Sequence, residues 1–207
     1  MTKPRIILIG AGGHAVSCID VIEQISEFSI FGLVGKSSEL NKKILGYHVL
    51  ANDENYSTLI KQCQFAVISV GQIKSPEARI SLYKRTIDHG FKMPVIISPL
   101  AYVSSHASIG QGTIVMPGAI VNAGAVIGKN CIINSNSLIE HNAEINDHCH
   151  ISTGAIVNGD VIIGFGTFIG SGSVIKQGIK IGSHCLVGMG ASIKNNLENN
   201  NHYRVNN

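Results

Sequence analysis

The chain has 207 residues, which allows one large domain or two small ones. Its net charge of +3 and its charged-residue content of 14% are too low to indicate binding to nucleic acid or to a membrane surface. No apolar run reaches the about 20 residues of a membrane-spanning helix, and the N-terminus lacks a signal-peptide layout, so we expect a cytoplasmic protein. The five cysteines form no paired motif, which favours reduced thiols in the core.

Residues 1–97 have the pattern of a compact α/β domain. Helices are expected at 16–25 and 54–62, and a third helix has Ser75 as its cap, Pro76 at its first position and Gly90 at its end. Strands that alternate with such helices predict a Rossmann-like sheet. Runs of branched apolar residues predict these strands at 5–9, 28–34, 44–50, 65–70 and 93–97.

A glycine-rich turn that includes Gly12 and Gly13 joins the first strand to the first helix. In this context the spacing G-x-G-x-x-A favours a nucleotide phosphate at the helix N-terminus. A dinucleotide fold would close the second strand with an acid that holds a ribose, but Gly35-Lys36 stands there and the first acid is Glu39. As explanations of this glycine-rich turn, we therefore place NAD binding below sugar-nucleotide binding and below a purely structural role. Gly71 ends the fourth strand, at the edge where α/β sheets bind ligands.

A six-residue repeat fills the rest of the chain. Every sixth residue from Val103 to Ile193 is valine or isoleucine, sixteen in succession, and the residue two places before each later one is mostly small. A step of six fits neither a helix nor a flat strand, but it fits short extended segments that are joined by turns and place one branched residue inward. We expect residues 98–194 to form a triangular solenoid with coils about 4.8 Å apart, and residues 195–207 to be a polar tail without regular structure.

The repeat has one strongly polar interruption, at residues 134–142, with more histidines just after it. His141 comes two places after an inward isoleucine, so it should point outward or toward a neighbouring subunit. The alternative for this ring is a solvated surface histidine. The candidate polar residues in and after the segment are Asn134, Glu140, His141, Asn142, His148 and His150.

The combination of Gly12-Gly13-His14 in an N-terminal α/β domain with Ile139-Glu140-His141 and His150 in the repeats resembles the sialic acid O-acetyltransferase family of hexapeptide-repeat acyltransferases. That family includes bacterial N-acetyltransferases of nucleotide-linked 4-amino-4,6-dideoxy sugars, of the UDP-bacillosamine and GDP-perosamine type. The resemblance implies a left-handed parallel β-helix, acetyl-CoA as co-substrate, no metal, and a role in lipopolysaccharide or other surface-glycan synthesis.

The resemblance also implies roles for single residues. His141 matches the general base, and an acid that follows the base in some members is replaced by Asn142, so that Glu140 or Glu144 would have to orient the ring. His150, Ser171 and Met189 match positions along acetyl-CoA, and Asn134 matches a sugar contact. Gly12, Gly13, His14 and Gly71 match the nucleotide pocket, in which Gly35 and Lys36 replace a pair of aspartates. The usual C-terminal motif beside CoA adenine is absent, and His202–Asn206 stands in its place.

The resemblance further implies a homotrimer with active sites between subunits. Ile114, Ile120, Val126 and Ile132 are the candidate contacts, and packing on the α/β domain is their alternative role. Two other functions stay open: an O-acetyltransferase of sialic or related nonulosonic acids, and a non-catalytic solenoid scaffold. A similar prism occurs in γ-carbonic anhydrases, which need three histidines as metal ligands. The spacings of seven and two among His141, His148 and His150 put the last two in one hexad and point them in different directions, so we do not expect zinc.

Overall fold

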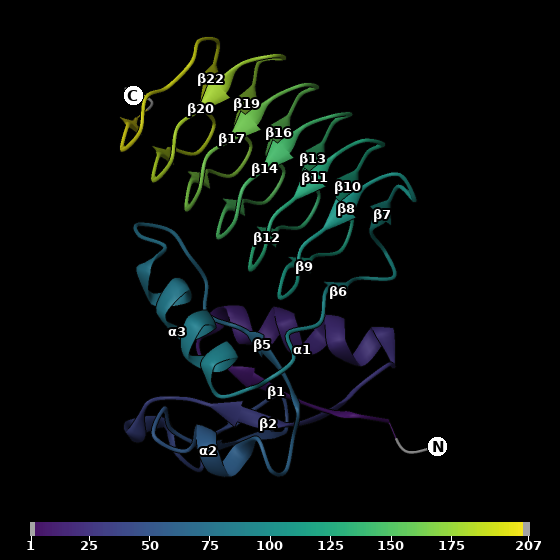
Figure 1. Cartoon of the computed structure of the whole chain (residues 1–207), viewed down its shortest axis with the longest axis vertical. Coiled ribbons are helices and arrows are strands. Elements are labelled where there is room, and N and C mark those ends of the chain that lie inside the picture. Colours follow the sequence, from purple (N-terminus) through teal and green to yellow (C-terminus); the bar gives the residue numbers. More distant parts are fainter. Residues whose placement is uncertain (1–2, 205–207) are drawn as a thin grey trace.

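The structure is a computed structural model that describes residues 3–204. Figure 1 shows the architecture expected from the sequence: an N-terminal α/β domain lies against a C-terminal left-handed parallel β-helix. The chain passes from one part to the other directly after α3, without a long linker.

The α/β domain is built on a five-stranded sheet in the order β3-β4-β2-β1-β5. Its neighbouring strands are parallel, except that β3 and β4 form a short antiparallel hairpin. Residues 6–9 of β1, which lies between β2 and β5, are all buried, because both faces of the sheet are covered. The strands are β1 (Arg5–Ile9), β2 (Ser29–Val34), β3 (Lys43–Ile44), β4 (Tyr47–Ala51) and β5 (Phe65–Ile68).

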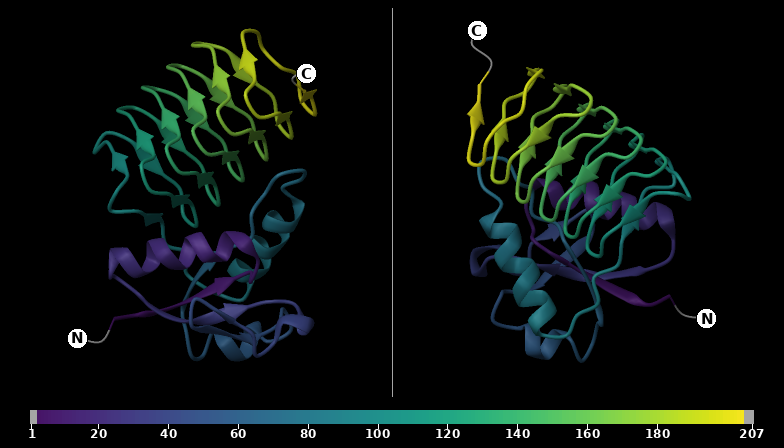
Figure 2. Two further views of the ribbon diagram at one scale, coloured as in Figure 1. Left: turned by 180° about the vertical axis from the view of Figure 1, so that it is seen from behind. Right: turned by 45° about the horizontal axis from the view of Figure 1, so that its top comes forward.

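Helix α1 (Gly13–Ile25) covers one face of this sheet, and α2 (Tyr56–Leu59) and α3 (Glu77–Asp88) cover the other. A 3-10 helix, η1 (Ser37–Glu39), follows β2. Helix α3 begins one residue later than predicted, and the Ser75 hydroxyl accepts a hydrogen bond from its first N–H. Figures 1 and 2 show α1 running between the sheet and the first coils of the β-helix, with α3 beside the coils.

Two expectations about the ends of the β-helix are wrong. The strand predicted at 93–97 as the last of the α/β sheet forms only at β6 (Ile96–Ile97), and it pairs with β9 of the β-helix. The polar tail, expected to lack regular structure from residue 195, continues the coil: Leu197 bridges to Ile181, and β23 (His202–Tyr203) pairs with β21. Main-chain hydrogen bonds hold β6 against the coil that follows it and the tail against the coil that precedes it. The apolar pattern of the sequence does not predict such bonds at the open edge of a sheet. Residues 205–207 of the predicted tail lie outside the described residues.

The β-helix is a triangular prism with three parallel sheets, which we call faces 1, 2 and 3. Residues 18 apart stack on neighbouring coils, so one coil consists of three hexads. Face 1 contains β6, β9 (Ile114–Val115), β12 (Ile132–Ile133), β15 (His150–Ile151), β18 (Phe168–Ile169), β21 (Leu186–Val187) and β23. Face 2 contains β7 (Tyr102–Val103), β10 (Ile120–Val121), β13 (Leu138–Ile139), β16 (Ile156–Val157), β19 (Val174–Ile175) and β22 (Ser192–Ile193). Face 3 contains β8 (Ser108–Ile109), β11 (Val126–Ile127), β14 (Glu144–Ile145), β17 (Ile162–Ile163) and β20 (Lys180–Ile181).

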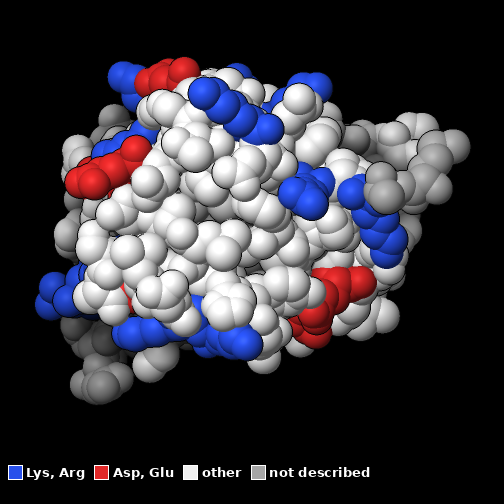
Figure 3. Space-filling model, turned by 90° about the horizontal axis from the view of Figure 1, so that it is seen from below, with Lys and Arg blue, Asp and Glu red and all other residues white. Residues whose placement is uncertain are grey.

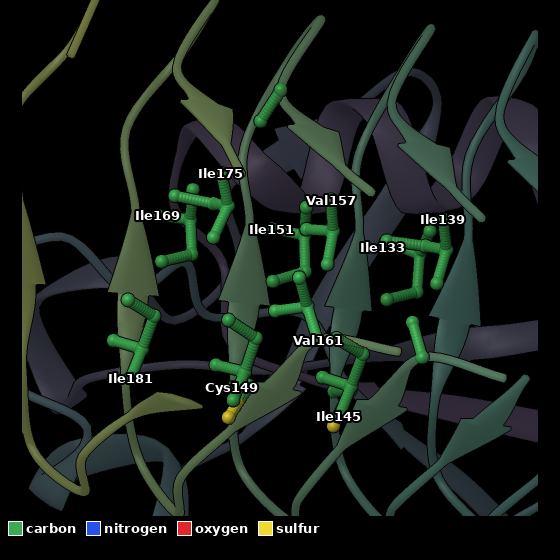
Figure 4. Close-up of a cluster of buried hydrophobic side chains, with 14 of the residues drawn as sticks. Ile133, Ile139, Ile145, Cys149, Ile151, Val157, Val161, Ile169, Ile175 and Ile181 are labelled. Atoms are coloured by element: carbon green, nitrogen blue, oxygen red, sulfur yellow. The ribbon is translucent and has the colours of Figure 1, made fainter. Parts of the chain in front are cut away.

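The predicted inward residues form the core of the prism. From Val115 to Ile193 every sixth side chain is buried, and Val103 and Ile109 at the open first coil are partly buried. Figure 4 shows these side chains pointing from the three faces into one common interior. The five cysteines are also buried and unpaired, as expected, and three of them occupy small-residue positions of the repeat.

The corners of the prism impose a second six-residue rule. Every sixth residue from Gly112 to Gly190 has a positive φ, so each corner turns through one left-handed residue. Glycine, asparagine, aspartate and histidine fill these places, since their side chains tolerate or locally stabilise that conformation. Asn142 and Asp160 are two such residues, at equivalent corners of successive coils.

The outward residues of the predicted trimer contact divide into two pairs. Ile114 and Ile132 lie on face 1 and are fully buried in the cluster that α1 forms with the sheet, which is their alternative role. Ile120 on face 2 and Val126 on face 3 remain exposed. Face 1 is thus partly covered within the chain itself.

Charged side chains of both signs are dispersed over the lower face of the molecule. In Figure 3, which views the molecule from below, they lie mostly around the rim, and Lys or Arg groups are interspersed with Asp or Glu groups. Among residues 3–204, no helix is both long and apolar enough to span a membrane.

Candidate functional site

Arg79 of α3 joins the α/β domain to the prism. Its buried guanidinium donates to the main-chain oxygens of Ile68 and Val70, at the carboxyl end of the sheet, and to both the carbonyl and the side-chain oxygen of Asn130 in the prism. Asn130 in turn lies 2.9 Å from Nδ1 of His148. This network fixes the sheet edge against the third coil, so it fixes any site that both parts build.

His150 lies beside this network, buried on face 1. Its Nδ1 lies 2.6 Å from the carbonyl oxygen of Gln72, and its Nε2 lies 3.0 Å from the Asn134 amide nitrogen. The carbonyl can only accept, so Nδ1 carries the proton and Nε2 accepts from Asn134. Gln72 follows Gly71, where a Cβ atom would lie 3.6 Å from the Cβ of His14. Four predicted ligand-binding residues, His14, Gly71, Asn134 and His150, therefore meet at the domain boundary.

Burial keeps both of these histidines neutral. Desolvation, with a further contribution from the positive charge of Arg79, lowers the pKa of His14 to about 3, and desolvation lowers the pKa of His150 to about 4. In the unfolded chain each ring would titrate near 6.5. Between about pH 6.5 and 4 the unfolded state therefore binds more protons than the folded state does.

We expect the free energy of unfolding to fall as the pH drops through this window, by about 1.4 kcal/mol per pH unit for each ring. Urea unfolding at pH 7.5 and at pH 5.0 measures the effect. His150→Gln should reduce the pH dependence, whereas His106→Gln, which changes an exposed ring, should leave it unchanged. An equal pH dependence in the wild type and the His150 variant would contradict this explanation.

A pocket of about 330 Å³ opens at the carboxyl edge of the sheet. Gly12, Gly35 and Lys36 of the predicted nucleotide site line it, together with Glu39 and Asp53. Helix α1 begins at this pocket with no acidic residue in its first turn and no side-chain cap. The N–H groups of Gly13 and His14 are therefore available to an anion, whereas that of Ala15 donates to the carbonyl oxygen of Gly12. Open space adjoins Gly12 and Gly13. These residues suit a nucleoside diphosphate, and Glu39 is a lining residue that the sequence analysis did not select.

His141 lies elsewhere, exposed at the corner between faces 2 and 3. Its ring rests on Gly159, where a Cβ atom would come within 2.6 Å of the imidazole. Its Nδ1 is 3.4 Å from the amide nitrogen of Asn142, and the same amide donates to Oδ1 of Asp160 at 3.2 Å. Asp160 is a residue that the sequence analysis missed, and it stands one coil after Asn142.

The two glutamates considered as orienting groups do not contact the imidazole. Glu140 accepts hydrogen bonds from the main-chain N–H of His141 and from the Asn122 amide, so it fixes the backbone of the corner. Glu144 is exposed on face 3, in β14. Asn142 is thus the polar side chain that reaches the ring, and Asp160 reaches it through Asn142.

Two of the three predicted cofactor residues follow the opposite edge of face 2. Ser171 and Met189 lie on successive coils at the corner between faces 1 and 2, whereas His150 begins strand β15 on face 1. Ser171 is hydrogen-bonded to Ser152 of the preceding coil, and the Met189 side chain is 78% exposed. The same corner leads to a hollow of about 670 Å³ at the C-terminal end of the prism, lined by Gly190, Ser192, Ile193, Lys194, Asn195, Leu197, Tyr203 and Arg204.

His148 belongs to neither edge. Its ring is packed edge-on against Tyr83 and Phe165 at the corner between faces 3 and 1. His141, His148 and His150 therefore occupy three different places around the prism, and in the described part of the chain no three His, Cys, Asp or Glu side chains gather as metal ligands would.

Comparisons with known families divide the chain in the same way as its structure. Residues 5–86 match the PglD N-terminal domain family, and residues 106–141, 124–159 and 160–195 match the bacterial transferase hexapeptide family of six repeats. A search of curated protein sequences finds no match.

Solved structures similar to this chain include two acetyltransferases. The acetyltransferase domain of PglB from Neisseria gonorrhoeae, in complex with acetyl coenzyme A, is 28% identical with a TM-score of 0.88, over 96% of this chain and 94% of that one. PerB from Caulobacter crescentus, in complex with CoA and GDP-perosamine, is 28% identical with a TM-score of 0.88, over 94% of this chain and 90% of that one.

Proposed function

We propose that this chain, a member of the hexapeptide-repeat acetyltransferases that carry a PglD N-terminal domain, acetylates the 4-amino group of a nucleotide-linked 4-amino-4,6-dideoxy sugar. The observation that carries the proposal is the pocket at Gly12, Gly35 and Lys36, in a chain similar over 94% of its length to an enzyme bound to CoA and GDP-perosamine. The product would be a building block for a surface glycan. The acetyl donor is acetyl-CoA, as in the similar enzymes.

In the reaction that we propose, His141 is the general base. A ring nitrogen takes a proton from the sugar amine while the amine nitrogen attacks the thioester carbonyl, and the CoA thiolate leaves and takes up a proton. The free amine is itself a good nucleophile, so no acyl-enzyme is needed and the buried Cys149 has no role. Burial raises the pKa of that thiol well above its ordinary value, which makes it a poor nucleophile.

A second copy of the chain would complete the site. His141 stands on one edge of face 2, and Ser171 and Met189 stand on the other, with no contact between the two groups among residues 3–204. The outward residues of face 2 are uncharged, and Tyr102, Ile120 and Val174 are exposed. Face 3 instead carries Glu144 and Lys180. A trimer that covers face 2 would bring the His141 edge of one copy beside the cofactor edge of the next.

The cofactor would follow the corner between faces 1 and 2. Its pantetheine arm would run past His150, Ser171 and Met189, and its nucleotide end would reach the 670 Å³ hollow at the end of the prism. Lys194 and Arg204 line that hollow and would attract its phosphates. These two cations take the place of the C-terminal motif that this chain lacks.

The proposal is tested by measuring the release of CoA thiol from acetyl-CoA with different acceptors. UDP-, GDP- and dTDP-linked 4-amino-4,6-dideoxy sugars form one group, and free sialic acid forms the other. We expect release with one or more members of the first group alone. Release with sialic acid alone would instead support an O-acetyltransferase, and no release with any acceptor would overturn both.

Asp160 is expected to position the base through Asn142. Asp160→Asn should lower kcat on the order of tenfold and leave the KM for acetyl-CoA unchanged, because a neutral amide holds the Asn142 side chain less firmly than a carboxylate does. Steady-state kinetics measure both constants. Asp88→Asn, at the end of α3, removes the same charge far from the ring and should change neither quantity. A wild-type kcat in Asp160→Asn would rule out this positioning role.

Similar enzymes support the separation of chemistry from binding. A variant of the Caulobacter crescentus perosamine N-acetyltransferase in which a histidine is replaced by asparagine was solved in complex with CoA and GDP-perosamine. That enzyme binds both ligands without the histidine side chain. We expect the same of this chain when its proposed base is removed.

A further inference from the structure

A single carboxylate reaches the end of β2, although neither residue that follows the strand is acidic. Glu39 ends the 3-10 helix η1, and its side chain folds back so that Oε2 accepts a hydrogen bond from the main-chain N–H of Lys36 at 2.8 Å. The same oxygen is 2.9 Å from the place where a Cβ of Gly35 would be. The turn thus delivers a carboxylate from position 39 to the place beside residues 35 and 36.

The packing around Gly35 explains why the carboxylate comes from a later residue. A Cβ at position 35 would also lie 3.0 Å from side-chain atoms of Ala11 and Val49. A side chain at position 35 would therefore meet Glu39, Ala11 and Val49 at its first carbon atom. Glu39 supplies the acid without placing any side chain at that point.

Glu39 faces the pocket that begins at the glycine turn. It lines the 330 Å³ cavity with Gly10, Gly12 and Lys36, and the apolar wall of that cavity is formed by Ile9, Val34, Val70, Ala78 and Leu82. Apolar walls with a few polar groups are typical of a site for a small ligand. A base and ribose would fill this cavity when the diphosphate lies at the N-terminus of α1, near Gly12 and Gly13.

The other acid of the cavity is already engaged. Asp53 forms an ion pair of 3.1 Å with Arg85 of α3. The Glu39 carboxylate, by contrast, has no ion-pair partner in the described part of the chain, and its Oε1 makes no hydrogen bond there. Glu39 therefore supplies a carboxylate oxygen with capacity to accept from a ligand.

We propose that Glu39 accepts hydrogen bonds from the ribose hydroxyls of the nucleotide and so selects ribonucleoside over 2′-deoxyribonucleoside diphosphate sugars. The inference rests on the proposed function, since it assigns a specificity residue in the same nucleotide pocket. Its physical basis is general: an acid at the end of the second strand of such a sheet is placed to bind ribose hydroxyls. This contact of Glu39 favours UDP- or GDP-linked acceptors over dTDP-linked ones.

Calorimetric titration of the full chain with UDP, dUDP, GDP and dGDP tests the proposal without knowledge of the sugar. The wild type should bind the better ribonucleotide about tenfold more tightly than its deoxy counterpart, as loss of a hydrogen bond to a charged group would give. Glu39→Ala should bring that ratio close to one. Glu39→Gln still accepts from Lys36 N–H and still bonds a hydroxyl, so it should keep most of the preference.

Glu27→Ala serves as the control, because it removes one exposed negative charge outside the pocket. It should leave the ratio of ribonucleotide to deoxyribonucleotide affinity unchanged. Equal binding of both forms by the wild type would overturn the role of Glu39 and leave the acetyltransferase proposal intact. An unchanged ratio in Glu39→Ala would also overturn it, and no binding of any nucleotide would overturn both proposals.

Discussion

Replacing His141 with asparagine is expected to lower kcat by about 10²–10⁴, the usual contribution of a general base. The reason is chemical, because an amide cannot take up the proton that the sugar amine must lose. The ring is exposed and rests on Gly159, so its loss leaves no buried cavity and should not unfold the corner. Acetyl-CoA affinity should stay unchanged, since the proposed cofactor residues line the other edge of face 2.

Steady-state kinetics and calorimetric titration with CoA separate these effects. His106→Asn is the matched control, because His106 is exposed at the same corner of the prism two coils earlier. It should keep wild-type kcat and wild-type CoA affinity. A His141→Asn enzyme with normal kcat would rule out this ring as the base, even with the fold unchanged.

The period of the repeat predicted the prism well, because one physical demand recurs at every step. Each hexad must place a branched residue inward, and the run from Val115 to Ile193 does so without exception. The sequence contains a second pattern with the same period. Every sixth residue from Gly112 to Gly190 is Gly, Asn, Asp or His, because each corner turns through a residue with positive φ. That signal would have identified Asn142 as a corner residue as well as a candidate for orienting His141.

The coil length of 18 residues would have revealed more of the site. Residues 18 apart stack, so Asn142 lies over Asp160 and Asn122 lies beside Glu140. Neighbours along the chain instead favour Glu140 and Glu144 as the groups that orient the ring. Only the stacking of successive coils brings Asp160 beside Asn142.

Other parts of the site could not be predicted from the sequence around them. The contact of His150 with Gln72 joins residues 78 apart and depends on how α3 and the sheet edge dock on face 1. The sequence of the strand at Ile96–Ile97 fits the α/β sheet and the β-helix equally well, because a short apolar run does not specify its hydrogen-bonding partner. The position of Glu39 depends on a single turn of 3-10 helix that bends the chain back.

Mixing two inactive variants is expected to restore activity if the site lies between copies of the chain. His141→Asn removes the proposed base, and Ser171→Trp would obstruct the cofactor path at the opposite edge of face 2. Each variant alone should have little activity. In trimers assembled at random from equal amounts, about one quarter of the interfaces would combine an intact His141 edge with an intact Ser171 edge, so activity should recover to about a quarter of the wild type.

The recovery must also depend on face 2. Adding Ile120→Lys to both chains places a charge on the exposed apolar residue of this face and should abolish both the recovered activity and the trimer seen by light scattering. Val126→Lys places the same charge on face 3 and should preserve both, because face 3 already carries Glu144 and Lys180. Recovery would fail if each chain held a complete site of its own. In that case the arrangement of His141 and Ser171 on opposite edges would need a different explanation, with the acceptor or the cofactor entering along a path other than face 2.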